Sequence, residues 1–258
     1  MTGRLDRRAV LALAVAGSVA AVVPQAAEAR GGGEVKVAVA ANFTAAAKEI
    51  AATFERAKGT KVVLSFGSTG QLYTQITQGA PFEVFLAADQ ARPKKAVDGG
   101  QAVPGTSFTY AVGKLVLFAK AKGIVAGEAV LKNGRFTRIA IANPMTAPYG
   151  AAAVETMKTI GVYDALKSRI VQGNNIAQTF QFVESGNAEL GFVALSQIVN
   201  VKGGSRWVVP ASMHRQIAQD AVLLKAGADN PAAREFLAFL SEPEARTVIE
   251  KFGYGFGG

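Results

Sequence analysis

Two consecutive strand-to-helix junctions decide the fold: VKVAVAANFTAAAKEI at residues 35–50 and VVLSFGSTGQLY at residues 62–73. Each begins with a β-branched run typical of a strand and continues into a helical pattern. Between strand and helix stand Asn42 in the first junction and Ser68 with Thr69 in the second. A helix N-terminus attracts anions, because it carries free backbone N–H groups and the positive end of the helix dipole. Since residues 40–47 and 65–76 carry no charge, we expect an anion site built from neutral donors.

The second junction also has a purely structural interpretation. Ser68 and Gln71 have the spacing of a capping box, in which the two side chains satisfy backbone N–H groups at the start of a helix. Capping alone accounts for Ser68, whether or not the neighbouring Thr69 meets a ligand.

The rest of the chain continues the alternation of strands and helices. We predict further strands near residues 84–87, 108–119, 138–142, 170–171, 190–195, 207–209 and 221–224. We predict helices near residues 44–57, 90–98, 231–240 and 243–252, and others that open at residue 68 and follow residues 150 and 176. This alternation is typical of an α/β fold with parallel-rich sheets flanked by helices.

Four of the junctions share one chemistry. They are Asn42, the pair Ser68 and Thr69, the segment 143–149, and the segment 173–176, and all lack Lys, Arg, Asp and Glu. Ligands of parallel sheets bind beyond the carboxyl ends of the strands, where such junctions meet. One neutral junction says little, because Gly, Asn, Ser and Pro are also the residues that turns require. Four together favour a shared site.

The N-terminus reads as an export signal. Arg4, Arg7 and Arg8 precede an apolar run at residues 9–23, and Ala29 ends a small-x-small cleavage signal. The apolar run is short of the ~20 residues that span a bilayer, which disfavours a membrane anchor. We predict a signal peptide over residues 1–29, cleaved after Ala29, and a periplasmic protein. The paired arginines leave both general secretory and twin-arginine export open.

Composition narrows the function further. The 258 residues carry a net charge of +9, but the basic residues are dispersed, so nucleic acid is not an expected partner. The absence of cysteine excludes disulfides, thiolate metal sites and a cysteine nucleophile. With His214 as the only histidine, few routes to catalysis remain, and we expect no enzymatic activity and no cofactor.

Several motifs resemble one family over the whole chain after residue 29. They are AANFT (residues 40–44), SFGSTGQLY (65–73), GAPFEVFLAAD (79–89), NPMTAPYG (143–150), ELGFVALSQ (189–197) and EKFGY (250–254). In this order they resemble the periplasmic molybdate-binding proteins of bacterial ABC transporters. The resemblance implies a two-lobed, type II periplasmic-binding-protein fold that closes over a tetrahedral oxyanion.

The resemblance also implies the contacts to that anion. They fall on Asn42, on Thr69 with Ser68 beside it, on Tyr149, and on the backbone N–H of Ile176. Asn42, Thr69, Tyr149 and Ile176 would contact the oxygens of molybdate or tungstate and would not bind the metal atom directly. Some family members carry a tyrosine where this chain has Ala194, so we expect Tyr149 to supply the phenol instead.

The resemblance further implies that the chain forms two lobes. Residues 33–111 plus 215–258 would form lobe one and residues 112–214 lobe two, with hinges near Ala111 and His214. The anion would favour the closed form, since only that form makes all the contacts, and a permease of the inner membrane would then receive it. We expect the protein to act as a monomer.

Two alternatives stay open at this point. A binding protein for another oxyanion, such as sulfate, would use the same neutral donors. Hydrogen phosphate is less suitable, because a site of donors alone leaves its proton unpaired, at about 1–3 kcal/mol. An enzyme on the same fold would need a nucleophile with a base or paired carboxylates. His214 lies outside the four junctions, and Asp89 is explained as a helix cap.

Overall fold

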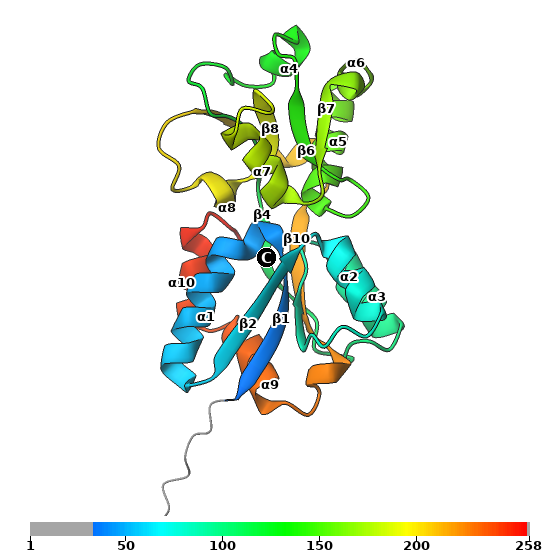
Figure 1. Cartoon of the computed structure of the whole chain (residues 1–258), viewed down its shortest axis with the longest axis vertical. Coiled ribbons are helices and arrows are strands. Elements are labelled where there is room, and N and C mark those ends of the chain that lie inside the picture. Colours follow the sequence, from blue (N-terminus) through cyan, green and yellow to red (C-terminus); the bar gives the residue numbers. More distant parts are fainter. Residues whose placement is uncertain (1–32, 257–258) are drawn as a thin grey trace, which may run out of the picture. The chain divides into compact units, whose positions relative to one another are not determined.

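The computed structural model describes residues 33–256, so the predicted signal peptide lies outside the described residues. Within them, ten strands form two five-stranded sheets (Figure 1). The first sheet has the order β2-β1-β3-β10-β4 and the second the order β7-β6-β8-β5-β9. Helices cover both faces of each sheet.

The first sheet contains β1 (Glu34–Ala40), β2 (Lys61–Gly67), β3 (Val84–Leu86), β4 (Phe108–Gly113) and β10 (Ile217–Leu223). One face packs against α1 (Thr44–Lys58), α9 (Pro231–Phe239) and α10 (Pro243–Lys251). The other face packs against α2 (Thr69–Thr77) and α3 (Ala91–Asp98). The first residues after β1 form the short 3₁₀ helix η1 (Ala41–Phe43), which runs directly into α1.

The second sheet contains β5 (Leu115–Ala119), β6 (Ile139–Ala142), β7 (Ile170–Gly173), β8 (Leu190–Ala194) and β9 (Ser205–Val208). One face packs against α4 (Ala129–Asn133), α5 (Pro148–Ile160) and α6 (Tyr163–Leu166). The other face packs against α7 (Ile176–Glu184) and α8 (Leu195–Ile198). Three more 3₁₀ turns are η2 (Lys167–Arg169), η3 (Ala211–Met213) and η4 (Lys225–Gly227).

The chain crosses from one sheet to the other at two places. Only Lys114 separates β4 of the first sheet from β5 of the second, and residues 209–216 return the chain from β9 to β10. Both crossings lie close to the predicted hinges. The lobe boundaries and the hinge residues themselves stay predictions.

The sheets are mixed rather than uniformly parallel. β1 runs parallel to β2 and β3, and β6 runs parallel to β7 and β8. β5 and β10, the first strands after the two crossings, run antiparallel to both of their neighbours. A fully buried strand has the same apolar composition in either direction, so the sequence pattern did not reveal this reversal.

Local signals placed most elements correctly. Gly59 ends α1 with φ at 69°, a left-handed conformation that glycine adopts without strain. The predicted capping box is confirmed, because Ser68 and Gln71 bond each other's backbone and side-chain groups at the start of α2. The short helices α4, α6 and α8 were not predicted, since one turn carries too little periodicity. No helix in residues 33–256 has the length and apolar character that crossing a membrane requires.

Candidate functional site

All five predicted site residues line one small pocket, which we call the neutral pocket. The strands β1, β2 and β3 of the first sheet and β6 and β7 of the second end around it. Its lining is Ala40, Ala41, Asn42, Gly67, Ser68, Thr69, Ala88, Ala147, Pro148, Tyr149, Asn175 and Ile176. None of these side chains is charged. The cavity volume is about 10 Å³, close to the smallest that holds one water molecule.

Three helices begin at the neutral pocket: α2, α5 and α7. None of them carries an acidic residue in its first turn. The side chain of Asn175 accepts the N–H groups of Ala177 and Gln178, each at 3.0 Å. The Ile176 N–H belongs to the same first turn, has no partner within the helix, and lies at the pocket lining. The helix starts therefore present positive dipole ends and N–H groups to the pocket.

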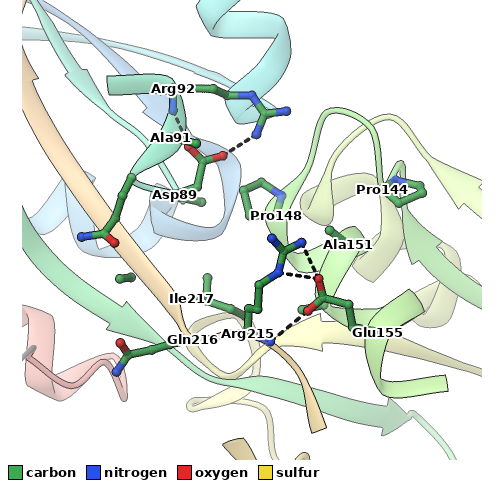
Figure 2. A pocket seen from close by; sticks show the side chains of 14 residues that line it. Asp89, Ala91, Arg92, Pro144, Pro148, Ala151, Glu155, Arg215, Gln216 and Ile217 are labelled. Carbon is green, nitrogen blue, oxygen red and sulfur yellow. Dashed lines mark hydrogen bonds and ion pairs between the residues drawn. The ribbon is translucent and has the colours of Figure 1, made fainter. Parts of the chain in front are cut away.

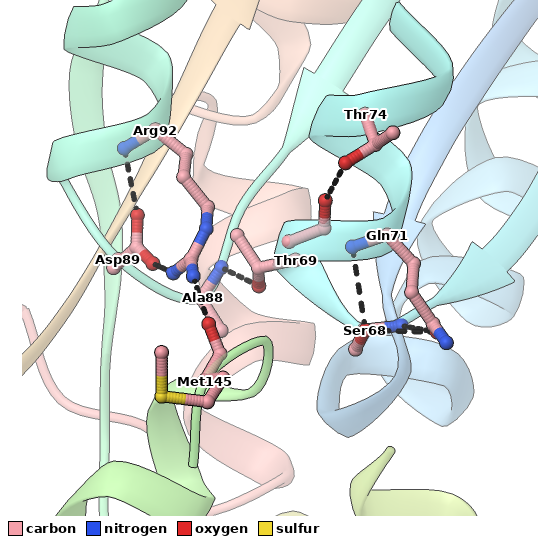
Figure 3. A network of polar contacts seen from close by, with 9 residues as sticks. Ser68, Thr69, Gln71, Thr74, Ala88, Asp89, Arg92 and Met145 are labelled. Atoms are coloured by element: carbon pink, nitrogen blue, oxygen red, sulfur yellow. Dashed lines mark hydrogen bonds and ion pairs between the residues drawn. The ribbon is translucent and has the colours of Figure 1, made fainter. Parts of the chain in front are cut away.

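The hydroxyls of Thr69 and Ser68 make different hydrogen bonds at the start of α2 (Figure 3). The Thr69 hydroxyl oxygen accepts the Ala88 N–H at 3.0 Å, so its own proton is available to donate. The Ser68 hydroxyl donates to Gln71 Oε1 at 2.8 Å, so its proton serves the capping box. Both residues line the pocket, but Thr69 is the one whose hydroxyl is set to donate to a ligand.

Asn42 is held in place by a buried network. Its Nδ2 donates to Gln219 Oε1 at 2.8 Å and to the Tyr254 hydroxyl at 3.0 Å. Its backbone carbonyl accepts from the hydroxyls of Tyr254 and Ser196, each at 2.8 Å. Because Ser196 belongs to α8 and Asn42 to η1, the network joins elements of both sheets at the pocket.

Tyr149 is buried at the second residue of α5. Its hydroxyl accepts a hydrogen bond from Gln219 Nε2 at 3.3 Å. Burial, assisted by the neighbouring phenols of Tyr254 and Tyr110, raises the pKa of Tyr149 well above its usual value, and the hydrogen bond from Gln219 and the nearby Asn42 amide only partly oppose this. The hydroxyl therefore keeps its proton and can act as a donor.

Sequence reasoning missed the residues that support the site from behind. Gln219, Tyr254, Ser196 and Ala88 contact the predicted site residues only through the tertiary structure. Ala88, Ser196 and Tyr254 lie in motifs that carry the family resemblance, and Gln219 is a polar residue within β10. Gln219 and Asp220 interrupt the apolar pattern of β10, and the predicted strand began at Ala221 whereas the strand begins at Ile217.

Two contacts join the rims of the pocket. The Gly70 N–H donates to the Thr146 carbonyl at 2.8 Å. A Cβ at position 70 would lie 2.9 Å from the Thr146 Cα, so only glycine permits this approach. Arg92, paired with Asp89, donates through Nη2 to the Met145 carbonyl at 2.9 Å (Figure 3).

Figure 2 shows a second, larger cavity. It shares Ala88 and Pro148 with the neutral pocket. We call it the charged cavity. Its volume is about 410 Å³, and its lining is Ala88, Asp89, Gln90, Ala91, Arg92, Pro144, Pro148, Ala151, Ala152, Glu155, Arg215, Gln216, Ile217 and Ala218. Its four charges form two ion pairs, Asp89 with Arg92 and Glu155 with Arg215. The positive and negative charges of the cavity therefore balance within each ion pair.

The described residues offer little to a metal or to catalysis at the neutral pocket. No group of three or more His, Cys, Asp or Glu side chains in residues 33–256 could hold a metal ion. His214 follows η3 outside the pocket, with Nδ1 2.7 Å from the Arg215 carbonyl oxygen. The geometry suits a ligand that accepts hydrogen bonds from neutral groups.

A model of the bacterial extracellular solute-binding proteins matches residues 35–255. The chain belongs to this family. It is 54% identical over 222 residues to the molybdate-binding protein ModA of Rhodobacter capsulatus, which covers 86% of this chain and 88% of that protein. Within the family the chain therefore belongs with the ModA proteins, as the sequence motifs predicted.

Solved structures of the family share the fold. The periplasmic molybdate-binding protein of Azotobacter vinelandii aligns with a TM-score of 0.85 at 39% identity, covering 87% of this chain and 100% of that chain. The substrate-binding domain assigned to a molybdenum ABC transporter from Clostridium difficile aligns with a TM-score of 0.67 at 28% identity, covering 87% and 99%. These likenesses confirm the predicted α/β periplasmic-binding-protein fold, and the named relatives are binding proteins rather than enzymes.

Proposed function

We propose that this protein captures molybdate in the neutral pocket, and tungstate with little discrimination, and delivers the anion to an ABC transporter. The observation that carries the proposal is the pocket itself, a small cavity at three helix N-termini whose lining contains no charged side chain. Relatives named as molybdate-binding proteins support the choice of cargo. The relative from Clostridium difficile supports the transporter as partner.

The donors fit a fully deprotonated tetrahedral dianion. Thr69 offers its hydroxyl, Tyr149 its phenol and Ile176 its backbone N–H, while Asn42 forms the wall at the end of β1. Ser68 holds the start of α2 in shape. Hydrogen bonds to a charged acceptor are each worth about 1.5–3 kcal/mol, so neutral donors suffice without a lysine or arginine.

The contacts across the pocket suggest how capture is coupled to shape. Residues from elements of both sheets line the pocket, so the complete set of donors exists only when the two sides are together. An anion that binds this arrangement best shifts the population toward it. We propose that the lobes are residues 33–111 plus 215–258 and residues 112–214, and that the permease reads their closed arrangement.

Export and oligomeric state complete the proposal. The predicted signal peptide, with cleavage after Ala29, would place the protein in the periplasm, where it would meet an inner-membrane permease. We propose that the protein acts as a monomer.

Thermal unfolding with added anions tests the proposed function. The chain from residue 30 onward is unfolded with molybdate, tungstate, sulfate and phosphate in separate titrations. A ligand at about 1,000 times its dissociation constant adds ~4 kcal/mol, which raises Tm by roughly 8–16 °C for a chain of this size. We expect this shift with molybdate and tungstate and a much smaller one with phosphate. A rise in Tm with sulfate alone would identify sulfate as the ligand instead. An unchanged Tm with all four anions would overturn the proposal.

A further inference from the structure

Gln219 is a fully buried polar side chain that lies behind the neutral pocket and does not line it. It occupies the third position of β10 and has no exposed surface. Glutamine is seldom buried to this degree, and a buried amide requires partners for both of its ends. Gln219 has them, and two of the partners are Asn42 and Tyr149, residues of the proposed anion site.

The two ends of the Gln219 amide serve different residues. Oε1 accepts from Asn42 Nδ2 at 2.8 Å and from the Tyr110 hydroxyl at 3.2 Å. Nε2 donates to the Tyr149 hydroxyl oxygen at 3.3 Å. Asn42 follows a strand of the first sheet and Tyr149 belongs to a helix on the second, so one side chain touches both sides of the pocket.

The orientation of this amide determines the direction of the Tyr149 hydroxyl. The Tyr254 hydroxyl donates its proton to the Asn42 carbonyl and so accepts from Asn42 Nδ2, which makes the end of Gln219 that faces Nδ2 the oxygen. With the amide reversed, two N–H donors would face each other. A phenol oxygen that accepts from Nε2 directs its own proton elsewhere, and the remaining direction is the pocket.

We propose that Gln219 is a positioning residue for specificity: it fixes the Tyr149 hydroxyl as a donor, so that the pocket accepts only anions without a proton. This inference rests on the proposed function. A donor-only site satisfies a fully deprotonated dianion, whereas hydrogen phosphate or hydrogen arsenate would place its own O–H against another donor. Gln219 thus acts on selectivity through Tyr149, without touching the ligand.

The backbone around Gln219 is shaped for this contact. A Cβ at Gly113 would lie 2.0 Å from the Tyr149 hydroxyl oxygen and 2.7 Å from Gln219 Nε2, so glycine leaves the space that the hydrogen bond occupies. The register between β10 and β4 shifts between Gln219 and Asp220, and Tyr110 is the additional residue on β4. Such bulges redirect side chains next to functional sites, and here the redirected Tyr110 bonds Gln219.

The substitution Gln219→Glu tests the proposal with almost no change of shape. In its ionised form the new carboxylate only accepts hydrogen bonds, so the Tyr149 proton then turns toward it and an oxygen lone pair faces the pocket. We expect the molybdate affinity to fall at least tenfold and the ratio of molybdate to phosphate affinity to fall at least tenfold as well. The added negative charge weakens the binding of both anions, so the ratio of their affinities reports the direction of the Tyr149 hydroxyl. Tyr110, Tyr149, Tyr254 and Asp220 are the titratable groups near the new carboxylate, and both anions are measured by calorimetry at one neutral pH.

Two further variants separate positioning from a structural role. Gln219→Met removes both hydrogen bonds at similar size and should lower the ratio less than Gln219→Glu, because the phenol can then turn either way. In a Tyr149→Phe background, Gln219→Glu should leave the ratio unchanged. Wild-type selectivity in folded Gln219→Met, which carries no ionisable group, would overturn the inference. A wild-type protein that binds no oxyanion would overturn the proposed function instead.

Discussion

The neutral pocket and the charged cavity lie side by side and share Ala88 and Pro148, yet their chemistry is opposite. The small neutral pocket has no charged lining residue and stands at three helix N-termini. The cavity of about 410 Å³ has four charged lining residues that neutralise one another in two ion pairs. The site proposed for a dianion is the one without charges.

The difference shows where a protein can place a dianion without a positive side chain. An arginine that is already paired with a carboxylate offers little net potential, as at Arg215 with Glu155. Fixed N–H groups and hydroxyls in a small space are preorganised, do not need desolvation of a counter-ion, and define the shape of the ligand. We expect substitutions in the neutral pocket to change anion affinity strongly and those in the charged cavity to change it weakly.

The largest effect is expected from adding one negative charge to the neutral pocket. Asn42→Asp retains the shape but removes the Nδ2 donor and introduces a carboxylate. Two unit charges about 4 Å apart repel by ~4 kcal/mol at an effective dielectric constant of 20, and the ligand carries two charges. We expect the molybdate affinity to fall at least about 1,000-fold, measured by calorimetry.

Gln216→Glu is the matched control, because it makes the same amide-to-acid change in the lining of the charged cavity. We expect its molybdate affinity to stay within about fivefold of wild type, since an exposed charge near paired charges is well screened. Equal losses in the two variants would show that the distinction between the two regions has no consequence for binding.

A smaller effect is expected from removing one donor. Tyr149→Phe deletes the buried phenol and should weaken molybdate binding by about 1.5–3 kcal/mol, or roughly 10–150-fold. It also leaves Gln219 Nε2 without its partner, so the free energy of unfolding without ligand should fall by about 1–3 kcal/mol.

Tyr163→Phe provides the comparison, because Tyr163 lies in α6 and lines neither cavity. Loss of the Tyr163 hydroxyl should leave the molybdate affinity, measured by calorimetry, unchanged. An unaltered affinity in Tyr149→Phe as well would remove Tyr149 from the site.

The sequence was informative about the neutral pocket because its signals are local. Asn42, Ser68, Thr69 and the segments 143–149 and 173–176 stand at helix starts, where residue type and position have a direct physical meaning. Parallel pairing then brings the starts after β1 and β2 to one edge of the first sheet, and those after β6 and β7 to one edge of the second. The family resemblance selected the same five residues, and the structure places all five in one lining.

The supporting contacts were not predictable in the same way. Asn42 and Gln219 are 177 positions apart, and Asn42 and Tyr254 are 212 apart. No local pattern pairs them, because their proximity depends on the antiparallel β10 and on the chain after α10. The charged cavity was missed for the same reason, since Glu155 and Arg215 meet only when α5 lies beside the return crossing.

The smallest effect is expected from the charged cavity, as a dependence of stability on pH. Partial burial opposes ionisation of Glu155, but hydrogen bonds from the backbone and guanidinium of Arg215, with the nearby His214, outweigh it and hold the pKa below its ordinary value of about 4.5. The folded state therefore binds this proton less tightly than the unfolded state does. The stabilisation is fully present above the ordinary pKa and is lost as pH falls through the lowered folded value.

Glu155→Gln removes this contribution, so the free energy of unfolding should become less sensitive to pH below about 4.5 and change by no more than about 1 kcal/mol at neutral pH, because Arg215 is largely exposed. Urea unfolding across that pH range measures both quantities. Glu128→Gln removes a carboxylate from the helical pair with Lys132 and serves as the control. If the acid dependence of Glu155→Gln matched that of wild type, the Arg215 contacts would not stabilise the ionised carboxylate. A molybdate affinity close to wild type in the same variant would show that the ion pair supports the structure beside the pocket and takes no part in holding the anion.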